Sequence, residues 1–248
     1  MSPLIIGIIS ILGLLTAAFS AVFGVAGGMM LFVILSLFLN AVIAVPVHAF
    51  TQLISNFSRV WVSFRLIDWK VVKEYMLLII PGAFLGSQLY KYFNADYLEI
   101  MVGCVIIAVL YFPFKDKVEK FKGMFLILGF VSGFLGMIIG VVGPLISPFF
   151  SIAGIKKEKM VATKAACQFF VQFVKIPAFG LLLQFDFTPY LFLILFLILA
   201  TITGTVIGNR FIHKISDKKY FMIERFVLTA LSLILITKSA IRILDISI

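Results

Sequence analysis

The sequence GVAGG at residues 24–28 interrupts an apolar run that extends from residue 4 to residue 39. This interruption decides the fold. A bilayer core about 30 Å thick is crossed by about 20 apolar residues, so the run is too long for one crossing. Because glycine permits unwound backbone, the run predicts a full helix, a break and a shorter half-helix.

A second cluster, GVVGP at residues 140–144, interrupts another long apolar run, from residue 122 to residue 153. Proline starts a helix well but cannot continue one, so this run also predicts a helix, a break and a half-helix. Adding 116 to a position in the first cluster carries Gly24 to Gly140. This correspondence indicates that the chain contains an internal duplication.

Further apolar segments fill the rest of the chain, at 43–64, 74–92, 97–114, 160–183, 187–212 and 220–243. Only 13% of the residues are charged and 62% are hydrophobic, whereas a soluble domain has about 25% charged residues. Lipid allows only helices or closed barrels to span it, and these runs lack the alternation of barrel strands. The sequence therefore predicts an all-α, polytopic integral membrane protein.

Polar residues follow one face of two of these segments. In the segment 43–64 the spacing i, i+4, i+8 and i+11 puts four side chains on a single helix face, and these are His48, Gln52, Asn56 and Arg59. Adding 116 carries each of them onto a polar residue of the segment 160–183, namely Lys164, Gln168, Gln172 and Lys175. We call these sets the first and the second stripe. Matched polar stripes are expected to face each other or a shared cavity.

The stripes contain three basic residues within membrane segments, Arg59, Lys164 and Lys175, and no acidic residue. A charge inside a membrane is costly and is by default a functional hypothesis. A positive stripe without an acid suits an anion. The structural alternative is that the amides only hydrogen-bond between helices.

The broken segments add to this hypothesis. A half-helix that starts near Gly28 or Pro144 would direct its free N–H groups and positive dipole end into the membrane, and helix N-termini bind anions. We therefore expect a substrate site at the midplane, with Gln52 and Gln168 in contact with the substrate. Arg59 and Lys175 are expected to guard its inner and outer approaches. The full set of expected site residues is His48, Gln52, Asn56, Arg59, Lys164, Gln168, Gln172, Lys175, Gly27, Gly28 and Gly143.

The distribution of positive charge distinguishes two arrangements in the membrane. If each broken segment crosses once, the lysines and arginines of the loops divide nine to eight between the two faces. If each enters and leaves on the same face, they divide fourteen to three. Positive charge marks the cytoplasmic side, so the second arrangement is favoured, with both termini extracytoplasmic. Each half then makes an odd number of net crossings, which predicts inverted repeats at residues 1–121 and 122–248 within one integrated transport domain. Each repeat has a broken segment and three transmembrane helices.

An enzyme is not expected. The sequence contains no H-E-x-x-H metal motif and no Walker A motif. The two histidines, His48 and His213, are far apart in the chain. We therefore expect no catalytic residue, no cofactor and no metal site. The net charge of +10 comes from short loops between apolar runs, which indicates membrane orientation signals rather than nucleic-acid binding.

Three motifs resemble the TauE/SafE family, also called the sulfite exporter or TSUP family. They are Gly24-Val25-Ala26-Gly27-Gly28, Gly140-Val141-Val142-Gly143-Pro144-Leu145 and Pro81-Gly82-Ala83-Phe84-Leu85-Gly86. The resemblance covers essentially the whole chain and implies a small inner-membrane transporter for sulfite, sulfonates or related organosulfur anions. Ala26 and Val142 stand where glycine is common in the family, so the resemblance implies the fold and the class of transporter rather than one substrate.

We thus expect a secondary transporter or facilitator that moves a small organic or inorganic anion across the cytoplasmic membrane, bound between the two repeats. The expected partners are the anion, the lipid bilayer, a coupling ion (H⁺ or Na⁺) and a second copy in a homodimer. The alternatives are a non-transporting membrane scaffold subunit, whose stripes only hold helices together, and a channel for a small solute.

Overall fold

A computed structural model describes residues 2–23, 26–39, 41–90, 92, 94–111, 121–140, 142–210 and 217–246. The helices are α1 (Pro3–Phe23), α2 (Ala26–Phe38), α3 (Ala41–Val62), α4 (Trp69–Met76), α5 (Ile79–Leu89), α6 (Ala95–Tyr111), α7 (Met124–Ile139), α8 (Gly143–Ile152), α9 (Lys157–Pro177), α10 (Leu191–Asn209) and α11 (Asp217–Ile246). The 3₁₀ turns η1 (Phe64–Leu66) and η4 (Thr188–Tyr190) and the π-helical turn η3 (Ala178–Leu182) join them. No strand occurs in these ranges.

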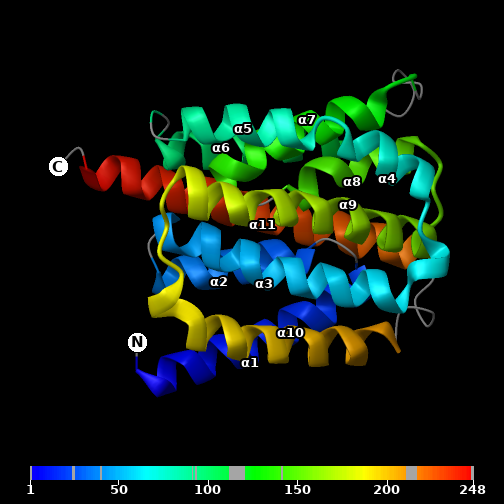
Figure 1. Cartoon of the computed structure of the whole chain (residues 1–248). Coiled ribbons are helices and arrows are strands. Elements are labelled where there is room, and N and C mark those ends of the chain that lie inside the picture. The colour runs from blue at the N-terminus through cyan, green and yellow to red at the C-terminus, as the bar shows by residue number, and fades with distance from the viewer. Residues whose placement is uncertain are drawn as a thin grey trace.

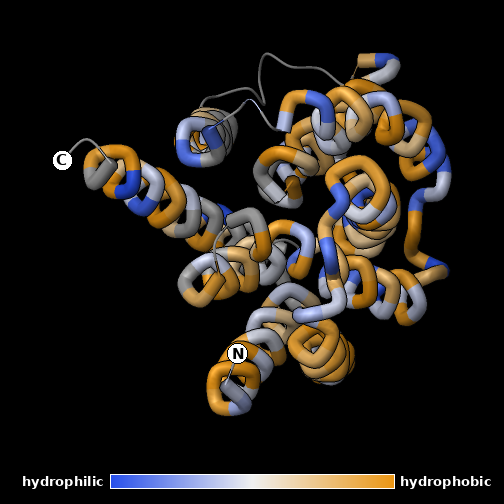
Figure 2. The backbone as a smooth tube through the Cα atoms, turned by 60° about the vertical axis from the view of Figure 1, so that its left-hand side comes forward, coloured by the Kyte–Doolittle hydropathy of each residue, from blue (hydrophilic) through white to orange (hydrophobic). Residues whose placement is uncertain are grey.

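The protein is an all-α, polytopic membrane protein. Four helices in the described ranges are long and apolar enough to cross a bilayer, within Pro3–Ala21, Glu158–Leu182, Thr188–Gly208 and Arg225–Leu244. Large hydrophobic side chains such as Leu4, Phe192 and Phe226 are more than 70% exposed. Apolar segments lie all around the outside of the bundle (Figure 2), as lipid contact requires.

Both long apolar runs are interrupted where the glycine clusters predict. Helix α1 ends at Phe23 and α2 begins at Ala26, while α7 ends at Ile139 and α8 begins at Gly143. Gly140 ends α7 with φ +84°, a conformation that favours glycine. Its N–H donates to the carbonyl of Gly136. Gly24, Val25 and Val141 lie outside the described residues.

The segment predicted as one helix at 74–92 is instead two helices, α4 and α5. The interruption at Leu77 and Leu78 has a local cause. Pro81 has no N–H to donate to the carbonyl of Leu77, four residues earlier, and its ring crowds that carbonyl. The chain therefore changes direction one turn before the proline.

The helix order after residue 121 repeats the order before it. With the same offset of 116, α1, α2 and α3 fall on α7, α8 and α9. The closest helix pairs correspond as well, because α1 packs along α10 and α7 packs along α5. Gly204 and Gly208 lie against the backbone of Leu14 and Ala18, and Gly82 and Gly86 lie against the backbone of Phe130 and Phe134. At each glycine pair, two helix backbones therefore pack closely, as small residues allow between membrane helices.

The two hydrophobic cores each combine both halves of the chain. One core joins α1, α2 and α3 to α10, and the other joins α7, α8 and α9 to α4. Helices α3 and α9 run in opposite directions through the middle of the molecule, and both chain termini lie at the left-hand end (Figure 1). The inverted relation of the repeats and their division at residue 121 stay predictions.

Candidate functional site

Both predicted stripes lie in the interior of the bundle. On α3 the exposed fractions of His48, Gln52, Asn56 and Arg59 are between 1% and 5%. On α9 those of Lys164, Gln168, Gln172 and Lys175 are between 0% and 8%. Spacing along a helix thus identified two sets of polar side chains that the fold removes from lipid.

The helices that carry the stripes lie side by side and antiparallel (Figure 1). The rings of Phe57 on α3 and Phe169 on α9 are 5.9 Å apart between centroids. Lys175 is close enough to His48 for their charges to interact. Both helices rise by about 1.5 Å per residue. The two contacts therefore imply that Gln52 on α3 and Gln172 on α9 lie at about the same height along the antiparallel pair.

His48 reaches the half-helix of its own repeat. Its Nε2 donates to the carbonyl oxygen of Gly28 in the first turn of α2, at 2.8 Å. The edge of the ring packs against Phe32, with centroids 5.5 Å apart. Its Nδ1 is buried and has no hydrogen-bond partner.

Lys175, at the same end of the stripes, reaches the other break. Its Nζ donates to the carbonyl oxygen of Gly140 at 2.9 Å, where α7 ends. The C-terminal end of a helix carries partial negative charge, and a cation placed there is stabilised. Gly140 also lies against Phe32 of α2 and Val45 of α3, so the α7–α8 break contacts the first repeat.

Arg59 and Lys164, at the opposite end, are held in the same way. The Arg59 guanidinium donates to Ser20 Oγ of α1 at 2.9 Å and to Asn56 Oδ1 at 2.6 Å. Lys164 Nζ donates to Ser147 Oγ of α8 at 2.7 Å. Arg59 therefore binds α1 in the first half of the chain, and Lys164 binds α8 in the second half. The roles of Arg59 and Lys175 as guards of the approaches stay predictions, and both side chains are buried rather than open to solvent.

The amides between these cations have unused hydrogen-bonding capacity. Asn56 Nδ2 and Gln172 Oε1 are buried without a partner. The Gln52 side chain lies against Gly28, where an added Cβ would be 3.2 Å from Oε1. A buried polar atom without a partner costs about 1–3 kcal/mol, which indicates that something else satisfies these atoms in the working protein.

The glycines of the expected site have different surroundings. Gly28 faces Gln52, whereas Gly27 faces α1, where any side chain would overlap Thr16 and Ser20. Gly143 is buried at the start of α8. Gly27 thus allows α1 and α2 to approach closely, and Gly28 lets Gln52 reach the start of a half-helix.

A cavity of about 360 Å³ lies elsewhere, between the last turn of α5 and the end of η3. Its lining residues are Ser87, Gln88, Leu89, Tyr92, Leu182 and Leu183. No stripe residue lines it, so a cavity shared by the two stripes stays a prediction.

Comparison with known proteins identifies the family. The family model described as sulfite exporter TauE/SafE matches residues 9–237, nearly the whole chain. The chain belongs to the TauE/SafE family. No curated protein and no solved structure matches it. The family is one of membrane transporters, which agrees with the apolar helices and with the polar interior of this TauE/SafE protein.

The sequence did not predict the hydrogen bonds that hold the basic residues of this TauE/SafE chain. Ser20, Ser147 and the carbonyl of Gly140 are far from their partners in sequence, and serines within apolar helices are common. One signal was available. The offset of 116 carries Ser20 to Gly136, and an added Cβ on Gly136 would be 3.6 Å from Lys175 Cδ. Arg59 thus lies against α1 at Ser20, and Lys175 lies against α7 at the corresponding position, Gly136.

Proposed function

We propose that this protein is a secondary transporter or facilitator for a small anion, of the sulfite or sulfonate class, bound near the midplane between α3 and α9. The observation that carries the proposal is the pair of buried stripes, with basic ends and unsatisfied amide atoms between them. The family match supports a membrane anion transporter. The substrate class comes from the family description.

The electrostatics of the interior favour an anion. Among the residues that the structure describes, none of the buried ones is an aspartate or glutamate, whereas Arg59, Lys164 and Lys175 are buried. Buried charges need partners, and the carbonyl of Gly140 that holds Lys175 is neutral. An anion between the stripes would supply the opposite charge.

The amides give the site its selectivity and its reversibility. Asn56 Nδ2 is a free donor, and the amide of Gln172 can present its N–H₂ group when the side chain turns over. Gln52 lies at the start of α2, where free backbone N–H groups and the helix dipole favour negative charge. Neutral donors at the centre would hold an oxyanion without binding it so tightly that it cannot leave, a balance that conduction also requires.

Binding measurements with matched variants test the proposal. Thermal shifts of the purified protein with sulfite, sulfate, thiosulfate and small sulfonates would first identify a ligand. In Gln52→Ala and Gln168→Ala, the loss of one hydrogen bond to a charged ligand is expected to weaken binding about tenfold or more. Gln88→Ala is the matched control, because Gln88 is an exposed glutamine that lines the cavity between α5 and η3 instead.

Flux in proteoliposomes separates the alternatives. A transporter variant would still fold but lose counterflow of the anion, whereas a scaffold would lose assembly with other proteins. A channel would show flux without counterflow. Normal transport by both Gln52→Ala and Gln168→Ala would contradict an anion site between the stripes. Weaker anion binding in Gln88→Ala alone would indicate that the anion binds in the cavity lined by Gln88.

A further inference from the structure

His48 has one free nitrogen in the interior of the site. A carbonyl oxygen can only accept, so the 2.8 Å contact with Gly28 requires the proton on Nε2. In the neutral ring, Nδ1 then carries a lone pair. This atom is buried without a partner, and His48 is 1% exposed. The ring is therefore positioned as a proton acceptor whose acceptor atom is unoccupied.

The charged surroundings of His48 are simple. Helices α1, α2, α5, α7, α8 and α10 contain no Asp, Glu, Lys or Arg within their bounds. On α9, Lys175 is the charge that acts on His48, and on α3 itself Arg59 lies eleven residues away. A proton on Nδ1 would thus add positive charge near Lys175, and a bound anion would offset both charges.

From this arrangement we infer that His48 Nδ1 is a proton-binding site that couples anion movement to proton movement in the same direction. The inference rests on the proposed anion transport. A proton from the aqueous phase on one side forms an N–H bond at the Nδ1 lone pair while the anion binds. On the other side the anion leaves, the N–H bond breaks, and the proton goes to the water there.

The direction of coupling follows from linkage. If a bound anion strengthens proton binding, the bound proton strengthens anion binding by the same factor. The two ligands therefore prefer to be on the carrier together, which is symport rather than exchange. For a monoanion each cycle moves one proton and one negative charge, so transport is electroneutral.

Wild-type protein in proteoliposomes tests the coupling. With the membrane potential clamped by valinomycin and potassium, vesicles that are one pH unit more alkaline inside are expected to accumulate a radiolabelled small sulfonate, a monoanion, about tenfold, because one pH unit equals one decade in concentration. The pH gradient sets the direction of accumulation by a symporter, whichever way the protein is oriented in the vesicle membrane. Pyranine trapped inside should report acidification as the anion enters.

Two variants test the assignment to His48. Glutamine at position 48 can still donate to Gly28 but cannot take a proton at pH 5–8, so His48→Gln should lose accumulation while its counterflow falls less. His213→Gln, which removes the other histidine, is the control. In Lys175→Gln, loss of the repelling charge should move the pH range of sulfonate binding upward. If Lys175→Gln instead abolishes the pH dependence, the proton site is Lys175 and the assignment is overturned.

The outcomes separate this inference from the proposed function. Sulfonate counterflow without accumulation or acidification would reject proton coupling and leave the anion transporter standing. Absence of counterflow for every anion in the panel would reject the proposed function itself. Accumulation in His48→Gln equal to that of wild type would also overturn the inference.

Discussion

At the scale of single residues, the basic side chains of the stripes stabilise the two breaks. Lys175 binds the carbonyl of Gly140, and Arg59 binds Ser20 near the end of α1. A helix that ends inside a membrane leaves carbonyls without intrahelical partners. Lys175 satisfies the carbonyl of Gly140 at the end of α7 and is itself stabilised by the helix dipole. In the proposed transporter, the same residues also supply positive charge to the anion site.

Gly140 is the position where this arrangement is most sensitive. Alanine there would have φ +84°, with its Cβ 3.1 Å from Val45 and 3.2 Å from Phe32. We expect Gly140→Ala to cost about 1–3 kcal/mol, which lowers Tm by roughly 3–10 °C. Thermal unfolding in detergent measures the change. Gly7→Ala is the control, since no atom lies within 4 Å of the added Cβ, and an equal loss in both variants would contradict the prediction.

Much of the candidate site could be predicted from residue spacing. The i, i+4, i+8, i+11 pattern identified eight buried side chains, because helix geometry alone decides which residues share a face. The partners of the basic ends could not be predicted. Ser20 and Ser147 are selected by how α1 and α8 pack, and single serines in apolar helices carry no signal for that. The interruption at Leu77 was missed although Pro81 marks it, because its apolar surroundings match those of one continuous helix.

At the scale of elements, glycines determine how closely the outer helices pack. Gly82 lies against the backbone of Phe130, and Gly204 lies against that of Leu14. The offset of 116 carries Leu14 to Phe130, and an offset of 122 carries Gly82 to Gly204. Backbones in contact gain packing that substitutes for the hydrophobic effect, which is absent between helices in lipid.

These contacts predict matched effects in the two halves. Gly82→Ala and Gly204→Ala should each push two helices apart and cost about 1–3 kcal/mol, as overpacked cores do. The two Tm shifts should be similar, because both residues meet the same kind of backbone contact. Gly180→Ala, whose nearest neighbour would be 4.0 Å away, should leave Tm unchanged. A large loss in one variant only would weaken the correspondence between the halves.

A polar contact at the start of α9 ties α4 to α9. Asp68 caps α4, and its carboxylate lies 2.9 Å from Lys159 Nζ. Its backbone N–H donates to Thr163 Oγ1 at 2.9 Å. The hydrogen bond from Lys159 lowers the pKa of Asp68 below its usual value. A carboxyl with a lowered pKa in the folded state contributes stability above its unfolded pKa, about 3.9, and loses it as pH falls through the folded value.

The ion pair predicts a pH-dependent difference between two variants. Asn caps a helix as well as Asp, so Asp68→Asn should lose only the ion pair, about 0.2–1 kcal/mol for a pair this exposed. Asp68→Ala should lose about 1 kcal/mol more with the cap. Thermal unfolding at pH 7 should show both losses. Near pH 3 the loss in Asp68→Asn should shrink, and a constant difference from wild type would mean that the pair contributes nothing.

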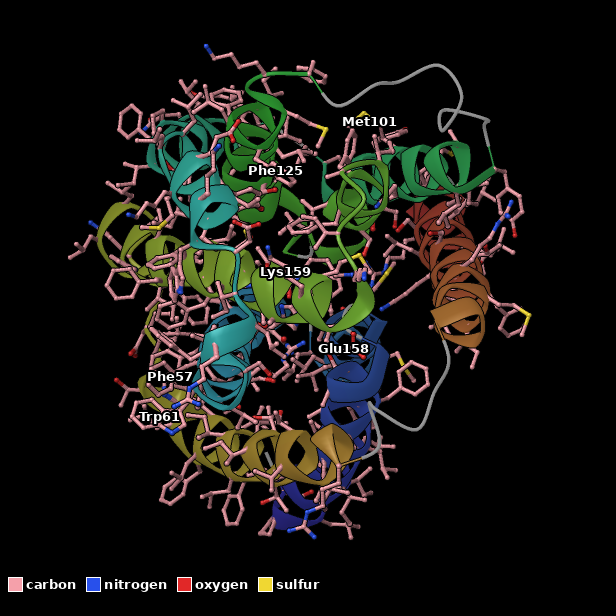
Figure 3. The ribbon with its side chains drawn as sticks, turned by 90° about the vertical axis from the view of Figure 1, so that its right-hand side faces the viewer. Phe57, Trp61, Met101, Phe125, Glu158 and Lys159 are labelled. Carbon is pink, nitrogen blue, oxygen red and sulfur yellow. The ribbon has the colours of Figure 1, made fainter. Side chains whose placement is uncertain are left out.

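At the scale of the whole molecule, the same contact bears on how the chain crosses the membrane. If each broken segment crossed once, Asp68 and Lys159 would lie on opposite faces of the bilayer, about 30 Å or more apart. They are 2.9 Å apart instead. Lys159 and Trp61 are both at the end of the molecule opposite the termini (Figure 3). This geometry supports broken segments that enter and leave on one face, as the fourteen-to-three division of positive charge predicts.

The last prediction concerns which face is cytoplasmic. Trp61 and Lys159 lie at the end away from the termini (Figure 3). The exposed basic residues Arg65, Lys70 and Lys156 are within a few residues of them or of Asp68, which pairs with Lys159, and positive charge marks the cytoplasmic side. Ser2 should therefore be extracytoplasmic. With both cysteines replaced, an impermeant thiol reagent should label Ser2→Cys in intact cells, and label Lys70→Cys and Lys156→Cys only after permeabilisation. Different labelling of the latter two would restore single crossings by the broken segments, because only that arrangement separates them. Labelling of both in intact cells, with Ser2→Cys protected, would reverse the orientation while keeping the fold, since the bundle is the same whichever face receives the charge.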